Sequence, residues 1–152
     1  MPVTIRMLDA TDTALLLAAD AALFDHPVRA ELVGAFFASE HHHLAGAIED
    51  DALVSFVSAV TYLHPDKPLH VWINEVSTLP ACRGRGLAGA VCRAMIDHGH
   101  QIGCHEIWLA TEDDNAAARA VYRKIGLRET TGIVMYDVPP RDVHGRHHDV
   151  TD

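Results

Sequence analysis

The stretch "LPACRGRGLAGA" (residues 79–90) decides the fold, because it joins a predicted strand to a predicted helix through a glycine-rich turn. The segment before it, "VWINEVST" (71–78), has the apolar and β-branched side chains typical of a strand. Helix formers follow over residues 87–102, and Gly103 is a typical helix end. The first N–H groups of a helix lack intrahelical partners and carry partial positive charge. A strand, a glycine turn and a helix in this order therefore predict an anion site.

The composition of the turn favours a phosphate as that anion. Glycine allows positive φ and a close approach of the backbone, and arginine can donate two hydrogen bonds to one phosphate. No Lys-Ser or Lys-Thr pair follows, so the turn is not a Walker loop, and its place after antiparallel strands argues against a dinucleotide fingerprint. The alternative is a solvated connection. The residues expected to contact phosphate are Arg83, Gly84, Arg85, Gly86, Leu87, Ala88 and Gly89.

The periodicity of the remaining chain predicts an α/β (α+β) protein. Strands are expected at residues 3–8, 42–50, 52–63, 69–79, 105–111 and 133–138, and helices at 9–23, 29–39, 87–102 and 115–126. Asp50 and Asp51 join two strands as a hairpin turn. Because hairpins join the early strands and helices join the later ones, we expect a mixed, mostly antiparallel central sheet with helices on both faces.

Length and charge limit the classes of function. The chain has 152 residues, which fits a single domain with a sizeable core. Its 21 acidic and 12 basic residues give a net charge of -9, which disfavours nucleic acid as a partner. This charge favours a cationic substrate, although it also serves solubility alone.

The sequence predicts a cytoplasmic protein without a membrane or metal partner. No run of about 18 apolar residues occurs, and the first residues do not form a secretory signal. Three cysteines without C-x-x-C spacing favour reduced thiols. The histidines of 41–43 and 144–148 lack a second ligand set, and His98 and His100 point about 200° apart on a helix.

Two motifs carry a resemblance to a known family. "RGRGLA" (83–88) matches the pattern Arg/Gln-x-x-Gly-x-Gly/Ala, and "NAAARAVYRKIGL" (115–127) is similar to Asn-x-x-Ala-x-x-x-Tyr-x-x-x-Gly-Phe. In this order, with one strand between them, they resemble the GNAT family of N-acetyltransferases. The departures are Leu127 in place of Phe, Ala88 where Gly is common, Cys82 where an aromatic residue or His is frequent, and Thr78 where Val is usual.

The resemblance implies a fold and a cosubstrate. It implies one acetyltransferase domain over residues 1–140, with about four helices and a splayed pair of parallel strands, followed by a flexible tail over 141–152. Acetyl-coenzyme A (acetyl-CoA) would place its pyrophosphate on the amides of the glycine turn. The backbone of Val76, Ser77 and Thr78 would face the thioester and the pantetheine arm. Asn115 would contact the same arm, although it also suits a helix N-cap.

The resemblance also implies catalytic roles for two side chains. Tyr122 would protonate the departing thiolate; a phenol with a pKa near 10 makes a modest donor to a thiolate with a pKa of about 8.5. Glu75 would accept the proton of the ammonium group, directly or through water. The alternatives are a packed aromatic ring for Tyr122 and a solvated strand position for Glu75. The acids of "EDD" (112–114) either border an amine pocket or favour the helix dipole.

Within the family, the middle of the chain is most similar to the aminoglycoside 3-N-acetyltransferases. The similarity runs from "FFASEHHHLAGAIEDDALV" through "YLHPDKP" to "INEVST" and includes "MYDVPP". It implies direct acetyl transfer, in a ternary complex, to a primary amine of a small cationic acceptor such as an aminoglycoside, and hence antibiotic resistance. A polyamine, a protein lysine or N-terminus, and a non-catalytic acyl-CoA sensor stay open, as does a homodimer.

Overall fold

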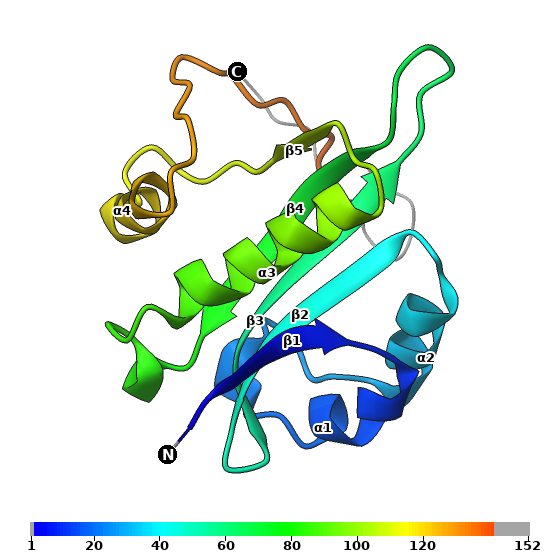
Figure 1. Cartoon of the computed structure of the whole chain (residues 1–152), viewed down its shortest axis with the longest axis vertical. Helices are drawn as coiled ribbons and strands as arrows, with labels where there is room; N and C mark the ends of the chain where they lie inside the picture. Colours follow the sequence, from blue (N-terminus) through cyan, green and yellow to red (C-terminus); the bar gives the residue numbers. More distant parts are fainter. Residues whose placement is uncertain (1, 142–152) are drawn as a thin grey trace.

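The computed structural model describes residues 2–141 and contains a five-stranded sheet in the order β1-β2-β3-β4-β5 (Figure 1). The strands are β1 (Thr4–Leu8), β2 (His42–Glu49), β3 (Ala52–Tyr62), β4 (His70–Thr78) and β5 (Glu106–Trp108). The α-helices are α1 (Thr13–Leu17), α2 (Ala30–Ala38), α3 (Leu87–Gln101) and α4 (Ala116–Lys124). Three short 3₁₀ segments add η1 (Ala10–Asp12), η2 (Ala21–Leu23) and η3 (Pro80–Cys82).

The sheet is mixed, as the sequence predicts. β1 to β4 pair antiparallel, and β4 pairs parallel with β5. The β2–β3 connection is the expected tight hairpin, in which Asp50 and Asp51 have φ of 51° and 61°. Two consecutive left-handed residues give the turn that matches strand twist, and Asp tolerates that conformation better than most residues.

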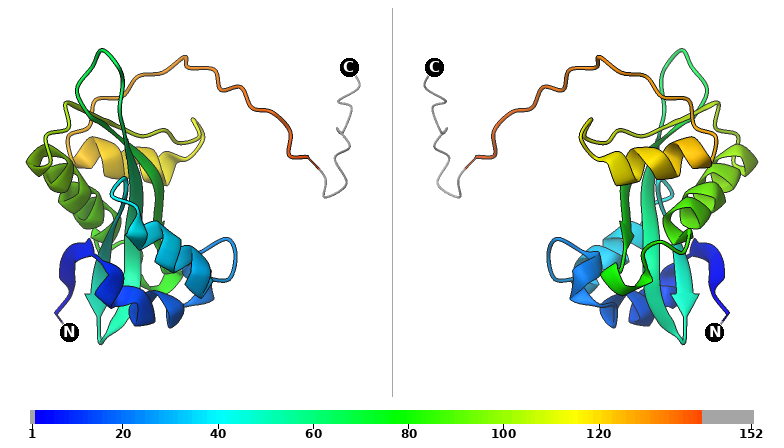
Figure 2. Two further views of the ribbon diagram at one scale, coloured as in Figure 1. Left: turned by 90° about the vertical axis from the view of Figure 1, so that its right-hand side faces the viewer. Right: turned by 90° about the vertical axis from the view of Figure 1, so that its left-hand side faces the viewer.

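Helices cover both faces of the sheet, which confirms that prediction (Figure 2). On one face, Val91, Cys92 and Met95 of α3 pack in a cluster with strand residues such as Val57 and Val71. The residues of the other cluster come from the segment that includes α1 and α2 and from the strands: Leu8, Leu16, Leu23, Val33, Leu44, Leu53 and Phe56. Burial on both faces explains why β3 is a nearly continuous apolar run rather than an alternating one.

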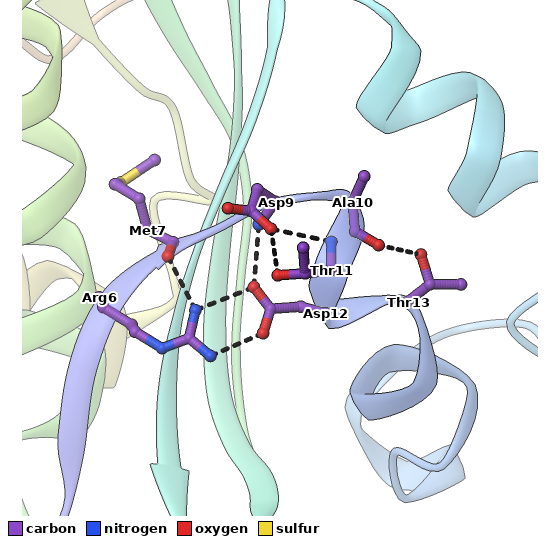
Figure 3. A network of polar contacts seen from close by, with 7 residues as sticks. All are labelled: Arg6, Met7, Asp9, Ala10, Thr11, Asp12 and Thr13. Atoms are coloured by element: carbon purple, nitrogen blue, oxygen red, sulfur yellow. Dashed lines mark hydrogen bonds and ion pairs between the residues drawn. The ribbon is translucent and has the colours of Figure 1, made fainter.

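The segment 9–23 differs from the single predicted helix. It forms η1, the five-residue α1 and η2, because acidic side chains cap short turns: Asp9 accepts the Thr11 N–H and Asp20 accepts the Ala22 N–H, both at 2.8 Å. Figure 3 shows Asp12 accepting two bonds from Arg6, at 2.6 and 2.9 Å, and one from the Asp9 N–H. The hydrogen bonds from Arg6 hold the pKa of the Asp12 carboxyl below its usual range.

The predictions for the end of the chain are partly wrong. β5 has three residues instead of seven, and the strand expected at 133–138 does not form. Residues 128–141 have no helix or strand, since no described strand lies beside them to complete a ladder. The tail predicted for 141–152 lies outside the described residues from position 142 on. Within the part of the chain that the structure describes, no helix is both long enough and apolar enough to cross a membrane.

Candidate functional site

The parallel strands β4 and β5 separate soon after they meet. Their ladder contains only three pairs, from His70 with Glu106 to Trp72 with Trp108. β4 continues to Thr78 and stays paired with β3 on its other side. Residues 73–78 therefore have no β5 partner in the described ladder. The sheet opens here, between α3 and α4.

A cavity of about 540 Å³, here named the α3–α4 cleft, lies at this opening. It brings together two sequence motifs that are far apart in the chain. Predicted site residues that line it are Val76, Ser77, Thr78, Arg83, Gly84, Gly86, Leu87, Ala88, Gly89 and Tyr122. The structure thus gathers most of the predicted site at the N-terminus of α3.

The glycine turn exposes the first amides of α3 to this cleft. Gly84 and Gly86 have φ of 76° and 77°, a conformation that other residues rarely adopt. A Cβ on either would meet no atom within 4 Å, so glycine serves the backbone conformation here and not a tight contact. Gly86 caps α3, and its carbonyl accepts from the Ala90 N–H at 3.0 Å. The three preceding N–H groups, of residues 87–89, belong to the helix turn that has no intrahelical partners.

The two arginines of the turn have different surroundings. Arg83 lines the cleft. Arg85 instead donates two hydrogen bonds to Glu49 at the end of β2, at 2.7 and 2.9 Å, and is not among the lining residues. This contact lowers the pKa of the Glu49 carboxyl. Arg85 thus lies outside the cleft lining with its charge paired, and its contact with a phosphate stays a prediction.

Other lining residues were not identified from the sequence. They are Cys82, Arg93, Ala117, Ala118, Ala120, Val121, Lys124 and Ile125. Most lie on α4, where Ala118 and Val121, together with the C-cap residue Ile125, follow the three- and four-residue spacing of one helix face. Placing the second motif on a helical wheel predicts that these three residues share one face. It does not predict that this face lies across the cleft from α3.

Tyr122 extends from α4 into a half-buried position against the core that surrounds α3. Burial, with a smaller contribution from Cys92, raises its pKa to about 12. The hydroxyl therefore keeps its proton at neutral pH. Gly89 permits the close approach of α3 to the end of α4, because a Cβ there would lie 3.1 Å from the Ile125 side chain.

Asn115 caps α4, which is the alternative that the sequence left open. Its Oδ1 accepts the Ala118 N–H at 3.1 Å, and its Nδ2 donates to the Thr111 hydroxyl at 3.3 Å. It does not line the α3–α4 cleft. A contact between Asn115 and the cofactor stays a prediction.

A second cavity of about 400 Å³, here named the α2–β4 pocket, contains Glu75. Its walls are mostly apolar: Leu16, Phe24, Pro27, Val28, Leu32, Val33, Phe36, Leu44 and Phe56. Its polar residues are Asp25, His26, Arg29, Ser58, Asn74 and Glu75. Burial raises the pKa of the Glu75 carboxyl, and the negative charge of Asp25 adds to the shift. Glu75 is therefore neither solvated on an open face nor part of the first cavity.

A β-bulge in β4 explains this position. The β3–β4 register moves from Ser58 opposite Glu75 to Ala59 opposite Ile73, so Asn74 has no partner. In a regular strand consecutive side chains alternate between faces, whereas here Asn74 and Glu75 both line the pocket. The next residue, Val76, lines the α3–α4 cleft. The two cavities therefore share the Glu75–Val76 step of one strand.

The histidines do not form a metal site among the described residues, where no group of three or more potential ligands was found. His98 lies beside His43, with 3.1 Å between their ring nitrogens. Burial is the main cause that lowers the pKa of His43 to about 4. Burial also lowers the pKa of His98, so both half-buried rings favour the neutral form at physiological pH.

Comparison with known proteins identifies the family. Residues 11–127 match the acetyltransferase (GNAT) family, so the chain belongs to it. The chain is 29% identical to N-alpha-acetyltransferase RimI of Mycobacterium tuberculosis over 129 residues, which cover 84% of this chain and 79% of that one. It is 27% identical to aminoglycoside N(6')-acetyltransferase type 1 of Salmonella typhimurium over 117 residues, which cover 73% and 81% of the two chains.

A solved structure shows the same fold. AAC(6')-Iy, in complex with the bisubstrate analog CoA-S-monomethyl-acetylneamine, superposes with a TM-score of 0.75 and 24% identity, over 90% of this chain and 98% of that one. The family makes this protein an acetyl-CoA-dependent N-acetyltransferase. The positive-φ glycines and the open amides of α3 fit the pyrophosphate of that cosubstrate. The aminoglycoside relatives carry the 6' position in their names, so the predicted 3-N branch is not supported.

Proposed function

We propose that the protein transfers an acetyl group directly from acetyl-CoA in the α3–α4 cleft to a primary amine held in the α2–β4 pocket. One observation carries this proposal: Glu75 lines the pocket and the next residue, Val76, lines the cleft. An amine near the carboxylate and a thioester near the Val76 backbone would therefore meet across one strand. No covalent enzyme intermediate is needed in this arrangement.

The chain's backbone and Arg83 would hold the cosubstrate, which supplies an acetyl group activated as a thioester. The amides of residues 87–89 and the Arg83 side chain provide donors and positive charge for the pyrophosphate. Residues 76–78 lack a β5 partner, so their backbone can bind the arm that carries the thioester. Donors placed there would also stabilise negative charge on the carbonyl oxygen.

Glu75 would prepare the amine. A protonated amine cannot attack, and most primary amines are protonated at neutral pH. A carboxylate with a pKa raised by burial is a stronger base than a solvated one. Asp25 lines the same pocket and would add attraction for the cation. Glu75 would thus bind the ammonium group and accept its proton.

Tyr122 would act on the departing thiolate as a proton donor through its hydroxyl hydrogen bond. Its pKa of about 12 keeps the hydroxyl protonated before the reaction. The thiolate of a thiol with a pKa of about 8.5 is a weaker base than the Tyr122 phenolate, so a complete proton transfer from Tyr122 is unfavourable. We therefore expect hydrogen-bond donation during bond breaking and a moderate contribution to the rate.

For the acceptor, we favour a small polycationic amine such as the 6'-amino group of an aminoglycoside. Two carboxylates line the α2–β4 pocket, the chain carries a net charge of -9, and the Salmonella relative bears this activity in its name. The apolar walls of the pocket support a second candidate, the α-amino group of a peptide with an apolar first side chain. The likeness to N-alpha-acetyltransferase RimI adds to this candidate.

A panel of amines tests these assignments. The protein is mixed with acetyl-CoA and with aminoglycosides, linear polyamines, free lysine or short peptides, and free thiol is measured. We expect the highest kcat/KM with an aminoglycoside that has a 6'-amino group, and much less with its 6'-hydroxyl counterpart. Higher activity with peptides would move the acceptor to an N-terminal amine. Thiol release that no amine accelerates would contradict the proposed acceptor site.

A further inference from the structure

The charge of the α3–α4 cleft is opposite to that of the whole protein. The chain has 21 acidic and 12 basic residues. Within the part of the chain that the structure describes, the cleft is nevertheless lined by three cationic side chains, Arg83, Arg93 and Lys124, and by no Asp or Glu. The α2–β4 pocket, in contrast, contains two carboxylates. An acidic protein that gathers cations in one cavity has a site there for a ligand with several negative charges.

The protein itself does not neutralise these three cations. Among residues 2–141, none of them takes part in an ion pair. Arg85, by comparison, is paired with Glu49. Arg93 and Lys124 are exposed, so their charged ends stay in water until a ligand binds. Their charges can therefore attract an anion from solution.

Arg93 lies farther along α3 than the groups expected to bind the pyrophosphate. Gly86, Gly89 and Arg93 follow the three- and four-residue spacing of one helix face, and all three line the cleft. From Leu87, at the start of α3, to Arg93 the helix axis rises by about 9 Å. The first amides of α3 and Arg83 lie at one end of this face. Arg93 therefore adds a positive charge beyond them.

Lys124 lies on the opposite wall of the cleft, at the end of α4. The two helices approach closely at this end, because a Cβ on Gly89 of α3 would lie 3.1 Å from the side chain of Ile125. Ala117, Val121 and Lys124 follow one face of α4, so the wall is apolar up to the ammonium group. Both helices thus bring a cation to the same cleft.

We propose that Arg93 and Lys124 bind the 3'-phosphate of coenzyme A and make the protein selective for this molecule over its 3'-dephospho form. This assignment rests on the proposed function, which places acetyl-CoA in the α3–α4 cleft. Coenzyme A carries charge at two places, its pyrophosphate and its ribose 3'-phosphate, whereas the pantetheine arm is uncharged. The glycine turn and Arg83 provide for the pyrophosphate. A phosphate monoester carries about two negative charges at neutral pH, which two cations balance, and arginine can donate two hydrogen bonds to it.

Calorimetry with two ligands tests the 3'-phosphate site. We expect the wild type to bind coenzyme A roughly 10-fold or more tightly than 3'-dephospho-coenzyme A, about the effect of one hydrogen bond to a charged group. Arg93→Gln with Lys124→Gln should weaken the binding of coenzyme A to the level of the 3'-dephospho form. The same variant should bind the 3'-dephospho form within about twofold of the wild type, because that ligand has no 3'-phosphate to lose. Equal affinity of the wild type for the two ligands would overturn the proposal, as would an equal loss of both ligands in the variant.

A matched variant separates a local contact from the overall charge. Arg123→Gln with Arg128→Gln removes the same charge from residues that do not line the cleft. This control should keep the wild-type preference for coenzyme A over its 3'-dephospho form. Loss of the preference in the control would assign the effect to net charge and contradict the 3'-phosphate site.

Gly86→Val distinguishes failure of this site from failure of the proposed function. This variant should lose the binding of both ligands, because both carry the pyrophosphate. Normal binding of coenzyme A in Gly86→Val would overturn the placement of acetyl-CoA in the cleft, and the 3'-phosphate site with it. Loss of both ligands in Gly86→Val, together with equal affinities in the wild type, would overturn the 3'-phosphate site alone.

Discussion

The α3–α4 cleft and the α2–β4 pocket are built in different ways. The α3–α4 cleft takes most of its lining from two continuous motifs, and its expected ligand contacts are backbone amides of the glycine turn. The α2–β4 pocket takes side chains from α1, α2, the loop between them, β2, β3 and β4. A backbone site depends on conformation, and therefore on glycine positions that a sequence shows directly. A side-chain pocket depends on tertiary packing, so its specificity can change through single substitutions.

The largest expected effect is loss of cofactor binding in Gly86→Val. At φ of 77° a β-branched residue is strained, so the turn must change shape and the amides of α3 lose their orientation. Isothermal titration calorimetry with coenzyme A should show binding reduced at least roughly 100-fold, about the effect of two lost hydrogen bonds to a charged group. Gly34→Val is the control, because Gly34 in α2 has nothing within 4 Å of its added Cβ. Normal binding in Gly86→Val would show that the glycine turn is not the phosphate site.

Tyr122→Phe tests the chemistry in the same cleft and should have the next largest effect. The ring and its packing stay, and only the proton donor is lost. We expect kcat to fall roughly 10- to 1000-fold with little change in the KM for acetyl-CoA. A kcat within twofold of the wild type would make Tyr122 a packing residue.

Glu75→Gln tests the α2–β4 pocket through its pH dependence. Because burial raises the pKa of Glu75, the wild-type kcat/KM should fall as the pH drops through this raised pKa and the carboxyl becomes protonated. The variant should lose this limb and fall roughly 100-fold at neutral pH, with partial recovery at high pH, where more amine is neutral. Identical profiles would remove Glu75 from the mechanism.

Glu75→Gln should not lower the thermal stability of the protein, although it lowers its activity. A carboxyl with a raised folded pKa is less stable when charged in the fold than in the unfolded chain, so its ionisation destabilises the protein above that pKa. Replacement by neutral glutamine should therefore leave the Tm at pH 7 unchanged or higher. A large decrease in Tm would show that the Glu75 carboxylate supports the fold.

The smallest effect separates the two arginines of the turn. Arg83→Gln should weaken coenzyme A binding several-fold and reduce its dependence on salt, because Arg83 lines the cleft. Arg85→Gln should change binding little, since the Arg85 charge is paired with Glu49. Equal losses in both variants would place Arg85 in the phosphate site after all.

The sequence predicted the features that local chemistry controls. The Asp50–Asp51 hairpin, the end of α3 near Gly103 and the turn at Gly86 depend on backbone conformations that few residues adopt. Features that depend on partners were missed. The segment 133–138 has the composition of a strand but no neighbouring strand among residues 2–141, and the charge of Arg85 is paired with a residue 36 positions earlier.

The position of Glu75 shows the same limit within one strand. Its presence on β4 was predicted, but the bulge at Asn74 depends on the register with β3, which the sequence of β4 alone does not contain. The second carboxylate of the pocket, Asp25, lies in the loop before α2 and was not identified as a site residue. No local pattern marks it, because only the fold brings it near Glu75.

Two-substrate kinetics test the division between the cavities most directly. With the best amine of the panel, KM for acetyl-CoA and KM for the amine are measured in the wild type, Arg83→Gln and Asp25→Asn. We predict that Arg83→Gln raises only the KM for acetyl-CoA and that Asp25→Asn raises only the KM for the amine, each several-fold. Asp25→Asn raising the KM for acetyl-CoA while leaving that for the amine unchanged would contradict the assignment of the acceptor to the α2–β4 pocket.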